Sequence, residues 1–166
     1  MNANKKDNKG FSLVELIIVI AIMAVLVGVL APAYLRYVEK SRKSADVQAI
    51  DAVMRAMEMA AIDPGLNVED GTVMKARLLN TSVTTTTNFI CINPNEDTTT
   101  NIIDELFETI GSYQLKSQEW AEIIIQGTVS GGQVTFKIKE SAPDGKKVLN
   151  YASDLNITSD DSISFQ

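Results

Sequence analysis

The chain has 166 residues and a formal net charge of −6, which is enough for one hydrophobic core with an appendage but not for several domains. It has no histidine, which excludes histidine general bases, Ser-His and Cys-His nucleophile pairs and histidine-ligated metals. The single cysteine, Cys91, cannot form an internal disulfide, and we expect it to be a small buried residue.

The charges are divided unevenly along the chain. Residues 1–43 carry seven Lys or Arg and three acids, a net charge of +4, whereas residues 44–166 carry eight Lys or Arg and eighteen acids, a net charge of −10. The acidic C-terminal part would repel a nucleic-acid backbone, so no nucleic-acid partner is predicted. It suits a head that faces solvent.

The first predicted element is a long apolar helix that starts near Phe11. Residues 16–31 contain no charged or strongly polar side chain, and a helix over residues 11–31 would cross roughly 30 Å of hydrocarbon. We therefore expect it to be able to span a membrane. One acid, Glu15, lies a few residues inside the run.

Three interpretations of this segment compete: a secretory signal peptide, a permanent anchor, and a helix that is in the bilayer for only part of its life. The basic leader and the A-x-A arrangement at Ala31-Pro32-Ala33 favour a signal peptide. The length of the apolar run, the lack of a polar stretch before Ala31, and Glu15 oppose it. Lys and Arg flank both ends, so the positive-inside rule gives no orientation.

Gly28 and Pro32 weaken the same turn of this helix. Proline removes the hydrogen bond that would reach the Gly28 carbonyl, and glycine costs about 1 kcal/mol relative to alanine. We predict a weak point in the helix here, with an ordinary membrane-helix proline as the alternative.

Beyond Pro32 the helical pattern continues to Ile62 and is predicted to end at Asp63-Pro64-Gly65. The apolar side chains of residues 45–61 cover an arc of about 200°. We expect this helix to pack against its own head on one side and against other chains on the other, or else to be buried deeply in one domain. Arg42 and Asp46, four residues apart, are interpreted as a solvated ion pair, with a pair shared with a neighbouring helix as the alternative.

The remainder is predicted to form a small α+β head with an antiparallel sheet that lies on the long helix. Alternating apolar residues and Gly- or Pro-containing turns mark the strands. In chain order, the expected elements are a long loop over 66–100 that includes the threonine tract 81–88 and a possible strand at 89–92, a helix over 101–110, paired strands over 120–129 and 133–139, and, after a turn at 142–145, a third strand near 148–151.

Other candidate sites are weak. Asp154, Asp160 and Asp161 could offer oxygen ligands to calcium, but they fit no recognised loop spacing, and a solvated acidic tail is the better interpretation. No pair of carboxylates, glycine-rich phosphate loop or activated nucleophile stands out. No catalytic residue, metal site or cofactor is predicted.

The N-terminal residues carry a resemblance to a known family. KG followed by FSLVELIIVIAIMAVLVGVLAPAY resembles the start of type IV prepilins: a short charged leader that ends in Gly10, then Phe11, then Glu15, an apolar helix, and Pro32 at its far end. The resemblance is detailed over about residues 5–40 and looser over the rest. It implies the type IV pilin fold, in which a long N-terminal helix packs on a small antiparallel sheet of three to four strands with an αβ loop.

The resemblance also implies segments and residue roles. A membrane prepilin peptidase would cleave between Gly10 and Phe11 on the cytoplasmic face and methylate the new Phe11 amine. Glu15 would act with Phe11 in assembly and subunit register, and pilin helices often melt near the position of Pro32. The implied segments are a removed leader over 1–10, a transmembrane or filament-core half of the helix over 11–32, an amphipathic half over 33–63 and a globular head over 64–166.

Physical chemistry supplies a reason for Glu15. A carboxylate in lipid costs up to a few kcal/mol and seeks a partner. Cleavage at Gly10 would create one, because the free amine of an incoming chain's Phe11 can meet Glu15 of a chain already docked.

Two departures from the family pattern bear on subtype. The glycine that the family usually has near Ala24 is absent, so the start of any melted stretch stays open. The disulfide that closes many pilin heads is impossible here, which is more typical of clostridial and other Gram-positive pilins and favours a major pilin of that kind.

The implied function is that of a structural, non-enzymatic subunit that polymerises into type IV pili for adhesion, aggregation or biofilm formation and surface motility. Implied partners are further copies of the chain, the prepilin peptidase, the assembly platform with its ATPases, and minor pilins. The implied location is the cytoplasmic membrane with the head outside, and the extracellular pilus after assembly. A type II secretion or competence pseudopilin is the alternative, and a membrane-anchored enzyme or receptor is a distant one.

Overall fold

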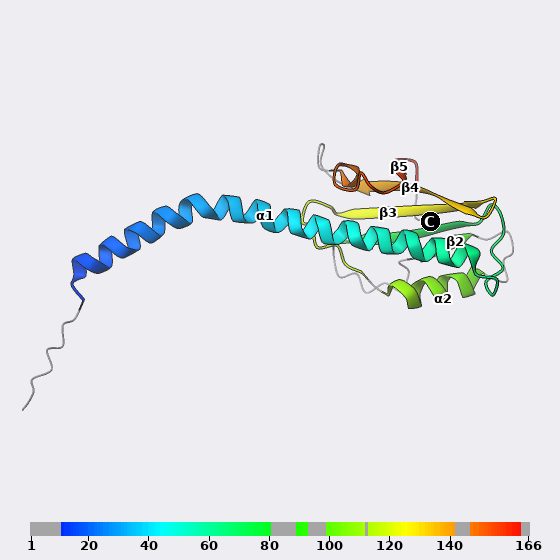
Figure 1. Cartoon of the computed structure of the whole chain (residues 1–166), viewed down its shortest axis with the longest axis horizontal. Coiled ribbons are helices and arrows are strands. Elements are labelled where there is room, and N and C mark those ends of the chain that lie inside the picture. Colours follow the sequence, from blue (N-terminus) through cyan, green and yellow to red (C-terminus); the bar gives the residue numbers. More distant parts are fainter. Residues whose placement is uncertain (1–10, 81–88, 93–98, 112, 142–146, 164–166) are drawn as a thin grey trace, which may run out of the picture. The chain divides into compact units, whose positions relative to one another are not determined.

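The computed structural model describes residues 11–80, 89–92, 99–111, 113–141 and 147–163 (Figure 1). The chain divides into two compact units, Met1–Val38 and Glu39–Gln166. Three predicted features lie outside the described residues: the leader with Gly10, the threonine tract 81–88 and the turn at 142–145.

Helix α1 covers Leu13–Ile62 and contains Pro32. It confirms the long helix that the sequence predicts, with its first turn two residues later. Asp63 ends the helix: its side chain accepts a hydrogen bond from the Gly65 N–H at 2.7 Å, and its carbonyl accepts one from the Leu66 N–H at 3.2 Å. These bonds turn the chain at the predicted Asp-Pro-Gly stop.

The described residues of the second unit form a five-stranded sheet with the order β2-β1-β3-β4-β5. All neighbours are antiparallel except β4 and β5, which run parallel. This architecture confirms the predicted α+β class. The elements after α1 are β1 (Val73–Leu79), β2 (Phe89–Ile92), α2 (Thr99–Ile110), β3 (Glu122–Ser130), β4 (Gln133–Ser141), the short 3-10 helix η2 (Val148–Asn150) and β5 (Ile157–Ser159).

Strands β3 and β4 form the predicted hairpin. Ser130 pairs with Gln133, so only Gly131 and Gly132 form the loop, with φ of 59° and 74°. Two consecutive positive φ angles characterise a type I′ turn, which glycine adopts without steric cost and which matches the twist of the strands.

Three features differ from the prediction. The sheet has five strands over the described residues instead of three to four, and one of its pairs is parallel. Strand β1 lies inside the predicted long loop, and its side chains alternate between buried and half-buried. The predicted third strand near 148–151 is wrong, because η2 stands there and β5 takes the sheet edge instead. The Val148 N–H donates to the Glu140 carboxylate rather than to a neighbouring strand.

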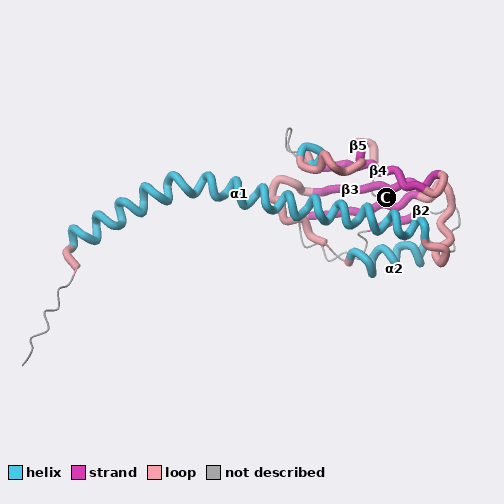
Figure 2. The backbone as a smooth tube through the Cα atoms, viewed as in Figure 1, coloured by secondary structure: helices cyan, strands magenta, loops and turns pink. Residues whose placement is uncertain are grey.

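The core of the second unit lies between the sheet and the helices. Figure 2 shows α2 and the C-terminal half of α1 beside the strands. The fully buried Trp120 joins this core. The main contributors are Ile50, Val53 and Met57 from α1, Ile102 and Leu106 from α2, and Met74, Leu78, Ile123, Ile125 and Ile138 from the sheet.

Gly127 on β3 permits close packing beneath α1. A Cβ at this position would lie 2.9 Å from Val134 Cγ1 and 3.2 Å from Met57 Sδ. The strand therefore has no room for a side chain where the helix passes.

Polar contacts fix α1 to the head at the point where the second unit begins. Asp46 is fully buried and accepts hydrogen bonds from the Tyr113 hydroxyl at 2.9 Å and from the N–H groups of Lys116 and Ser117 at 2.8 Å each. Burial and the bond to Asp46 raise the pKa of Tyr113, so its phenol stays protonated as a donor. The predicted solvated Arg42–Asp46 pair is therefore wrong, and Arg42 instead lies 3.6 Å from Glu39.

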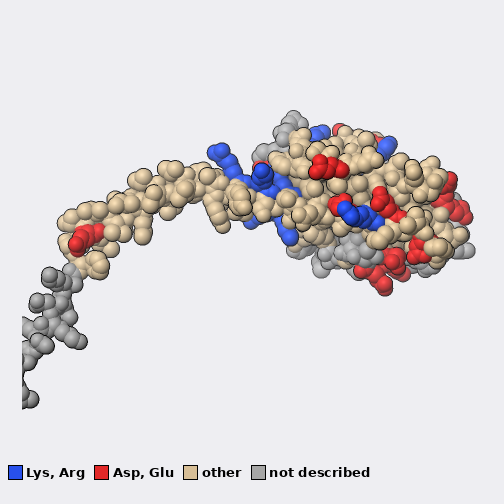
Figure 3. Space-filling model, in the orientation of Figure 1, with Lys and Arg blue, Asp and Glu red and all other residues tan. Residues whose placement is uncertain are grey.

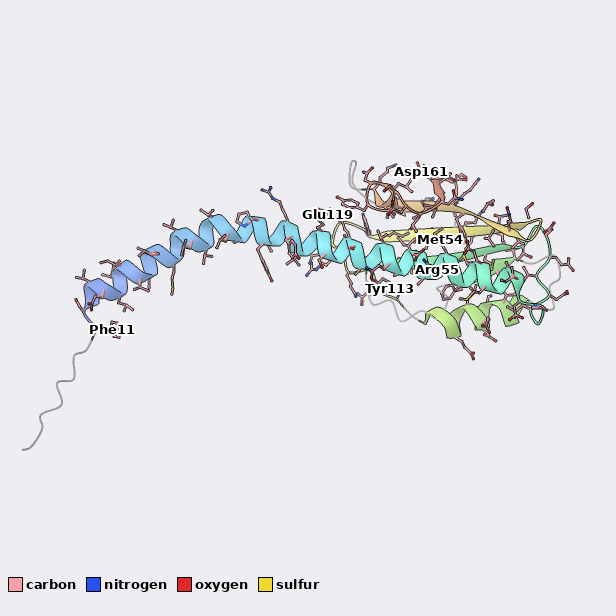
Figure 4. All side chains as sticks on the ribbon, in the orientation of Figure 1. Phe11, Met54, Arg55, Tyr113, Glu119 and Asp161 are labelled. Carbon is pink, nitrogen blue, oxygen red and sulfur yellow. The ribbon has the colours of Figure 1, made fainter. Side chains whose placement is uncertain are left out.

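Lys43 makes a second buried attachment. It is only 4% exposed, pairs with Glu119, and donates to the Tyr151 hydroxyl at 3.0 Å. Its ammonium lies 4.3 Å from the centroid of the Tyr151 ring, within cation–π range. Burial alone would lower the pKa of Lys43, but its bonds to Glu119 and Tyr151 outweigh burial and raise it. Figure 4 shows Tyr113 and Glu119 beside α1.

We expect Asp46→Ala to lower the free energy of unfolding by about 3 kcal/mol, because the acceptor is fully buried and three donors, one of them on the buried Ser117, lose it. Thermal unfolding of the detergent-solubilised chain, followed by circular dichroism, measures this. The matched control is Asp51→Ala on the same helix, whose partner Arg55 is 71% exposed, so that loss should stay below about 1 kcal/mol. Equal losses in the two variants would contradict the structural role of Asp46.

We expect Gly127→Val to destabilise the head by about 1–3 kcal/mol, because the new side chain must displace Val134 and Met57. The same unfolding assay measures it. Ser130→Val, at an exposed position of the same strand, is the control and should leave the unfolding temperature almost unchanged. A Gly127→Val variant as stable as this control would show that the packing there is looser than described.

Candidate functional site

The N-terminal part of α1 exposes an almost continuous apolar surface. Every side chain from Phe11 to Tyr37 is exposed within the single chain. Among the described residues, α1 is the one helix long and apolar enough to cross a membrane by length and composition. A soluble monomer rarely exposes so large an apolar patch, so this surface requires lipid or other protein chains as its partner.

Glu15 closes a capping box at the beginning of this helix. Since α1 begins at Leu13, Ser12 is the N-cap residue and Glu15 occupies the third helical position. The Ser12 N–H donates to Glu15 Oε2 at 2.8 Å, and the Val14 N–H donates to Ser12 Oγ at 3.3 Å. The S-x-x-E pattern of SLVE is the sequence signature of this cap. Ser12 is the site residue that the sequence prediction missed.

The cap changes the physical account of Glu15. A carboxylate at a helix N-terminus is favoured by the helix dipole, so Glu15 already has one stabilising interaction inside its own chain. The cap uses Oε2, and an ionised carboxylate has about four acceptor sites on its two oxygens. Glu15 is thus held in one orientation and retains capacity for a cationic partner.

Phe11 directly precedes the capping box and begins the described chain (Figure 4). Its side chain is 94% exposed. A terminal amine at Phe11 would stand next to Ser12 and four residues from Glu15. The predicted partners of the assembly interaction therefore begin the same apolar segment.

Gly28 and Pro32 both lie inside α1, which is assigned as helix without interruption through them. A Cβ at Gly28 would meet no atom within 4 Å beyond its chain neighbours and the surrounding backbone of its own helix. No packing within the single chain therefore requires glycine there. The weak point at this turn stays a prediction.

The C-terminal aspartates are engaged separately. Asp160 accepts hydrogen bonds from the Ser162 hydroxyl and from Lys137, which together lower its pKa to about 2. Asp154 accepts a hydrogen bond from the Ser153 hydroxyl at 3.3 Å. Among the described residues, no group of three or more His, Cys, Asp or Glu side chains could hold a metal ion.

Cys91 is buried, as predicted, and is a free thiol. Burial raises its pKa to about 11. The thiol therefore stays protonated and unreactive near neutral pH.

Comparison with protein families matches residues 5–31 to the prokaryotic N-terminal methylation motif. A fimbrial protein of Moraxella nonliquefaciens is 31% identical over 144 residues, which cover 78% of this chain and 88% of that protein. A fimbrial protein of Pseudomonas aeruginosa is 27% identical over 64% of this chain and 73% of its own length. Prepilin peptidase-dependent protein A of Clostridium perfringens (strain 13 / Type A) is 29% identical over 68% of this chain and 76% of its own length. No solved structure matches the chain.

The similarity to the Moraxella protein extends well beyond the N-terminal motif into the head. The methylation motif coincides with the capping box and the exposed apolar helix, and an α+β head follows. These findings together identify the chain as a member of the type IV pilin family, a structural subunit of the pilus.

Proposed function

We propose that the chain is stored in the membrane through residues 11–32, is cleaved between Gly10 and Phe11, and is then transferred into the core of a pilus. The observation that carries this proposal is the capped Glu15 at the start of a fully exposed apolar helix. The methylation motif and the name of the clostridial relative support processing by a prepilin peptidase, with methylation of Phe11.

Burial of the apolar side chains alone does not make the filament core energetically more favourable than the membrane for this helix. Lipid tails are as apolar as leucine, so moving the helix from lipid into a helical core gains little from the hydrophobic effect. Close packing supplies attraction but tolerates several registers along a smooth apolar surface. A polar interaction is needed to select one register.

Glu15 of one copy and the Phe11 amine of another would supply that selection. At 4 Å in an effective dielectric of 20, two unit charges attract by about 4 kcal/mol. Removing both charges from water offsets much of this gain, so the pair contributes register more than net stability. The capping box favours the interaction because Glu15 is already oriented and loses less side-chain entropy.

Such a contact joins different surfaces of successive copies. A heterologous contact that does not close into a ring generates a helical fibre. We infer that each segment of the chain has its own role. Residues 1–10 are the leader, 11–32 the membrane and filament-core helix, 33–63 the amphipathic half of the helix and 64–166 the head.

Adhesion, aggregation and surface motility are the pilus activities that we propose for the filament. Copies of the chain, an assembly platform with ATPases and minor pilins are its proposed partners. The clostridial relative and the lone buried cysteine favour a disulfide-free pilus of the Gram-positive kind. The apolar helix suggests membrane anchoring before assembly, with the head outside.

The Glu15→Gln variant distinguishes the helix-capping role of residue 15 from the role of its negative charge. Glutamine can still accept the Ser12 N–H bond, but it cannot pair with an amine. We expect Glu15→Gln and Glu15→Ala both to remain in the membrane and to yield no sheared filaments, as scored by electron microscopy and immunoblotting. Ser12→Ala, which weakens only the cap, is the control and should still assemble. Normal piliation by Glu15→Gln would show that the charge of Glu15 is dispensable.

The mature chain recovered from sheared filaments should begin at Phe11 and carry one methyl group on its terminal amine. Intact-mass measurement with N-terminal sequencing checks this, and the membrane fraction of a strain without the peptidase is the control. The proposed processing fails if residues 1–10 persist in the filament. If the chain is absent from the long external filaments, a pseudopilin role is favoured instead.

A further inference from the structure

The end of α1 turns two large apolar side chains toward solvent. Met59 is 54% exposed and Ile62 is 70% exposed, whereas Ala56, Met57 and Ala60 of the same turns are in the core. Met59 and Ile62 are three residues apart, so they form one ridge on the helix surface.

Two hollows flank this ridge. One, of about 110 Å³, is lined by Met59, Asp63 and Glu105 together with Ala56 and Ala60. The other, of about 390 Å³, is lined by Ile62 and Glu58 together with residues 132–134 and Asn156. Each hollow thus combines apolar walls with at least one carboxylate. Figure 3 shows that acidic side chains gather at this end of the head.

We call Glu58, Met59, Ile62, Asp63 and Glu105 the distal surface. All five side chains are exposed. The distal surface is complementary to a partner with both apolar groups and positive charge. The positive charge would pair with its carboxylates, and the apolar groups would bury Met59 and Ile62.

The segment Tyr34–Tyr37 has this chemistry. Tyr34 is 66% exposed, Leu35 66% and Tyr37 72%, and Arg36 lies among them with its side chain also exposed. Tyr34 and Tyr37 are three residues apart and share a face of the helix. Tyrosine and arginine are among the residue types most enriched at the energetic centres of protein interfaces. Lys40 follows three residues later and is exposed as well.

We propose that Tyr34–Tyr37 of one copy docks on the distal surface of a second copy, with the tyrosines beside Met59 and Ile62 and with Lys40, three residues after Tyr37, facing the carboxylates. The inference rests on the proposed filament and names one of its contacts. Residues 44–166 carry a net charge of −10, so heads packed together repel one another unless positive charge lies between them.

The two surfaces are different, so the contact is heterologous and repeats along a helical fibre when the rotation between copies does not close into a ring. The other conceivable occupant of Tyr34–Tyr37 is the membrane interface, where tyrosine and arginine are also favoured.

Zero-length crosslinking of unaltered filaments tests the contact. A carbodiimide joins a lysine amine directly to a carboxylate, and peptide mass spectrometry locates the link. We expect Lys40 to be joined to Glu58, Asp63 or Glu105 in sheared filaments but not in the same chain dispersed in detergent. Lys40 and Asp63 are 23 positions apart, about 35 Å along the helix, so a link between them must join two copies.

A cysteine pair gives an independent test. Tyr37→Cys combined with Ile62→Cys should produce disulfide-linked dimers and higher species in oxidised filaments. Tyr37→Cys combined with Thr135→Cys, at an exposed position on β4, is the matched control and should remain monomeric. The buried Cys91, with its pKa raised to about 11, adds no background.

The outcomes separate this inference from the proposed function. If filaments form but show neither the Lys40 crosslink nor disulfide-linked dimers of the Tyr37→Cys and Ile62→Cys variant, the docking contact is overturned while the pilin function stands. Absence of any filament from the unaltered chain would overturn both. Links that occur equally in dispersed chains would also overturn the contact, because they would not depend on assembly.

Discussion

The rest of this chain depends on one constraint: the exposed apolar surface of the N-terminal part of α1 is unfavourable in water. From Phe11 to Tyr37 no described side chain is buried, so this segment must always be covered by lipid or by protein. The head has its own core, which includes none of these residues. Because the two units do not share a core, the segment can change its surroundings without unfolding the head.

Two carboxylates on α1 accept hydrogen bonds in different environments, one exposed and one buried. Glu15 accepts the Ser12 N–H at the first turn and stays exposed. Asp46 is fully buried and accepts three donors from the segment 113–117. Glu15 is therefore still accessible to a group from another chain, whereas the acceptor sites of Asp46 are used within its own fold. Under the proposed function, Glu15 would act in assembly, whereas Asp46 stabilises the fold of the single chain.

Local patterns made much of the fold predictable. The period of apolar residues identified α1, and the Gly131-Gly132 turn with alternating residues identified the β3–β4 hairpin. Strand β1 was missed because Lys75 and Arg77 occupy its half-buried positions and the small Ala76 adds a weak apolar signal to the other face. The family motif marked Phe11 and Glu15, whereas the cap by Ser12 depends on the S-x-x-E spacing, a separate signal carried by the same segment.

The attachment of α1 to the head could not be predicted, because its partners are distant in sequence. Tyr113 is 67 residues from Asp46, and Tyr151 is 108 residues from Lys43. A charged residue in an apolar arc has the same sequence signature whether it is solvated or paired in the interior. Only the folded chain shows which of these applies.

These attachments also determine how the head would carry tension. Glu39, Lys43 and Asp46 are bonded to the segment 113–119 and to Tyr151 at the point where the second unit begins. A force pulling on the N-terminal end of α1 would load these bonds before it reached the apolar core. With no internal disulfide possible, the strength of the subunit under load would depend on a few partly or fully buried hydrogen bonds and one ion pair, which can re-form after they break.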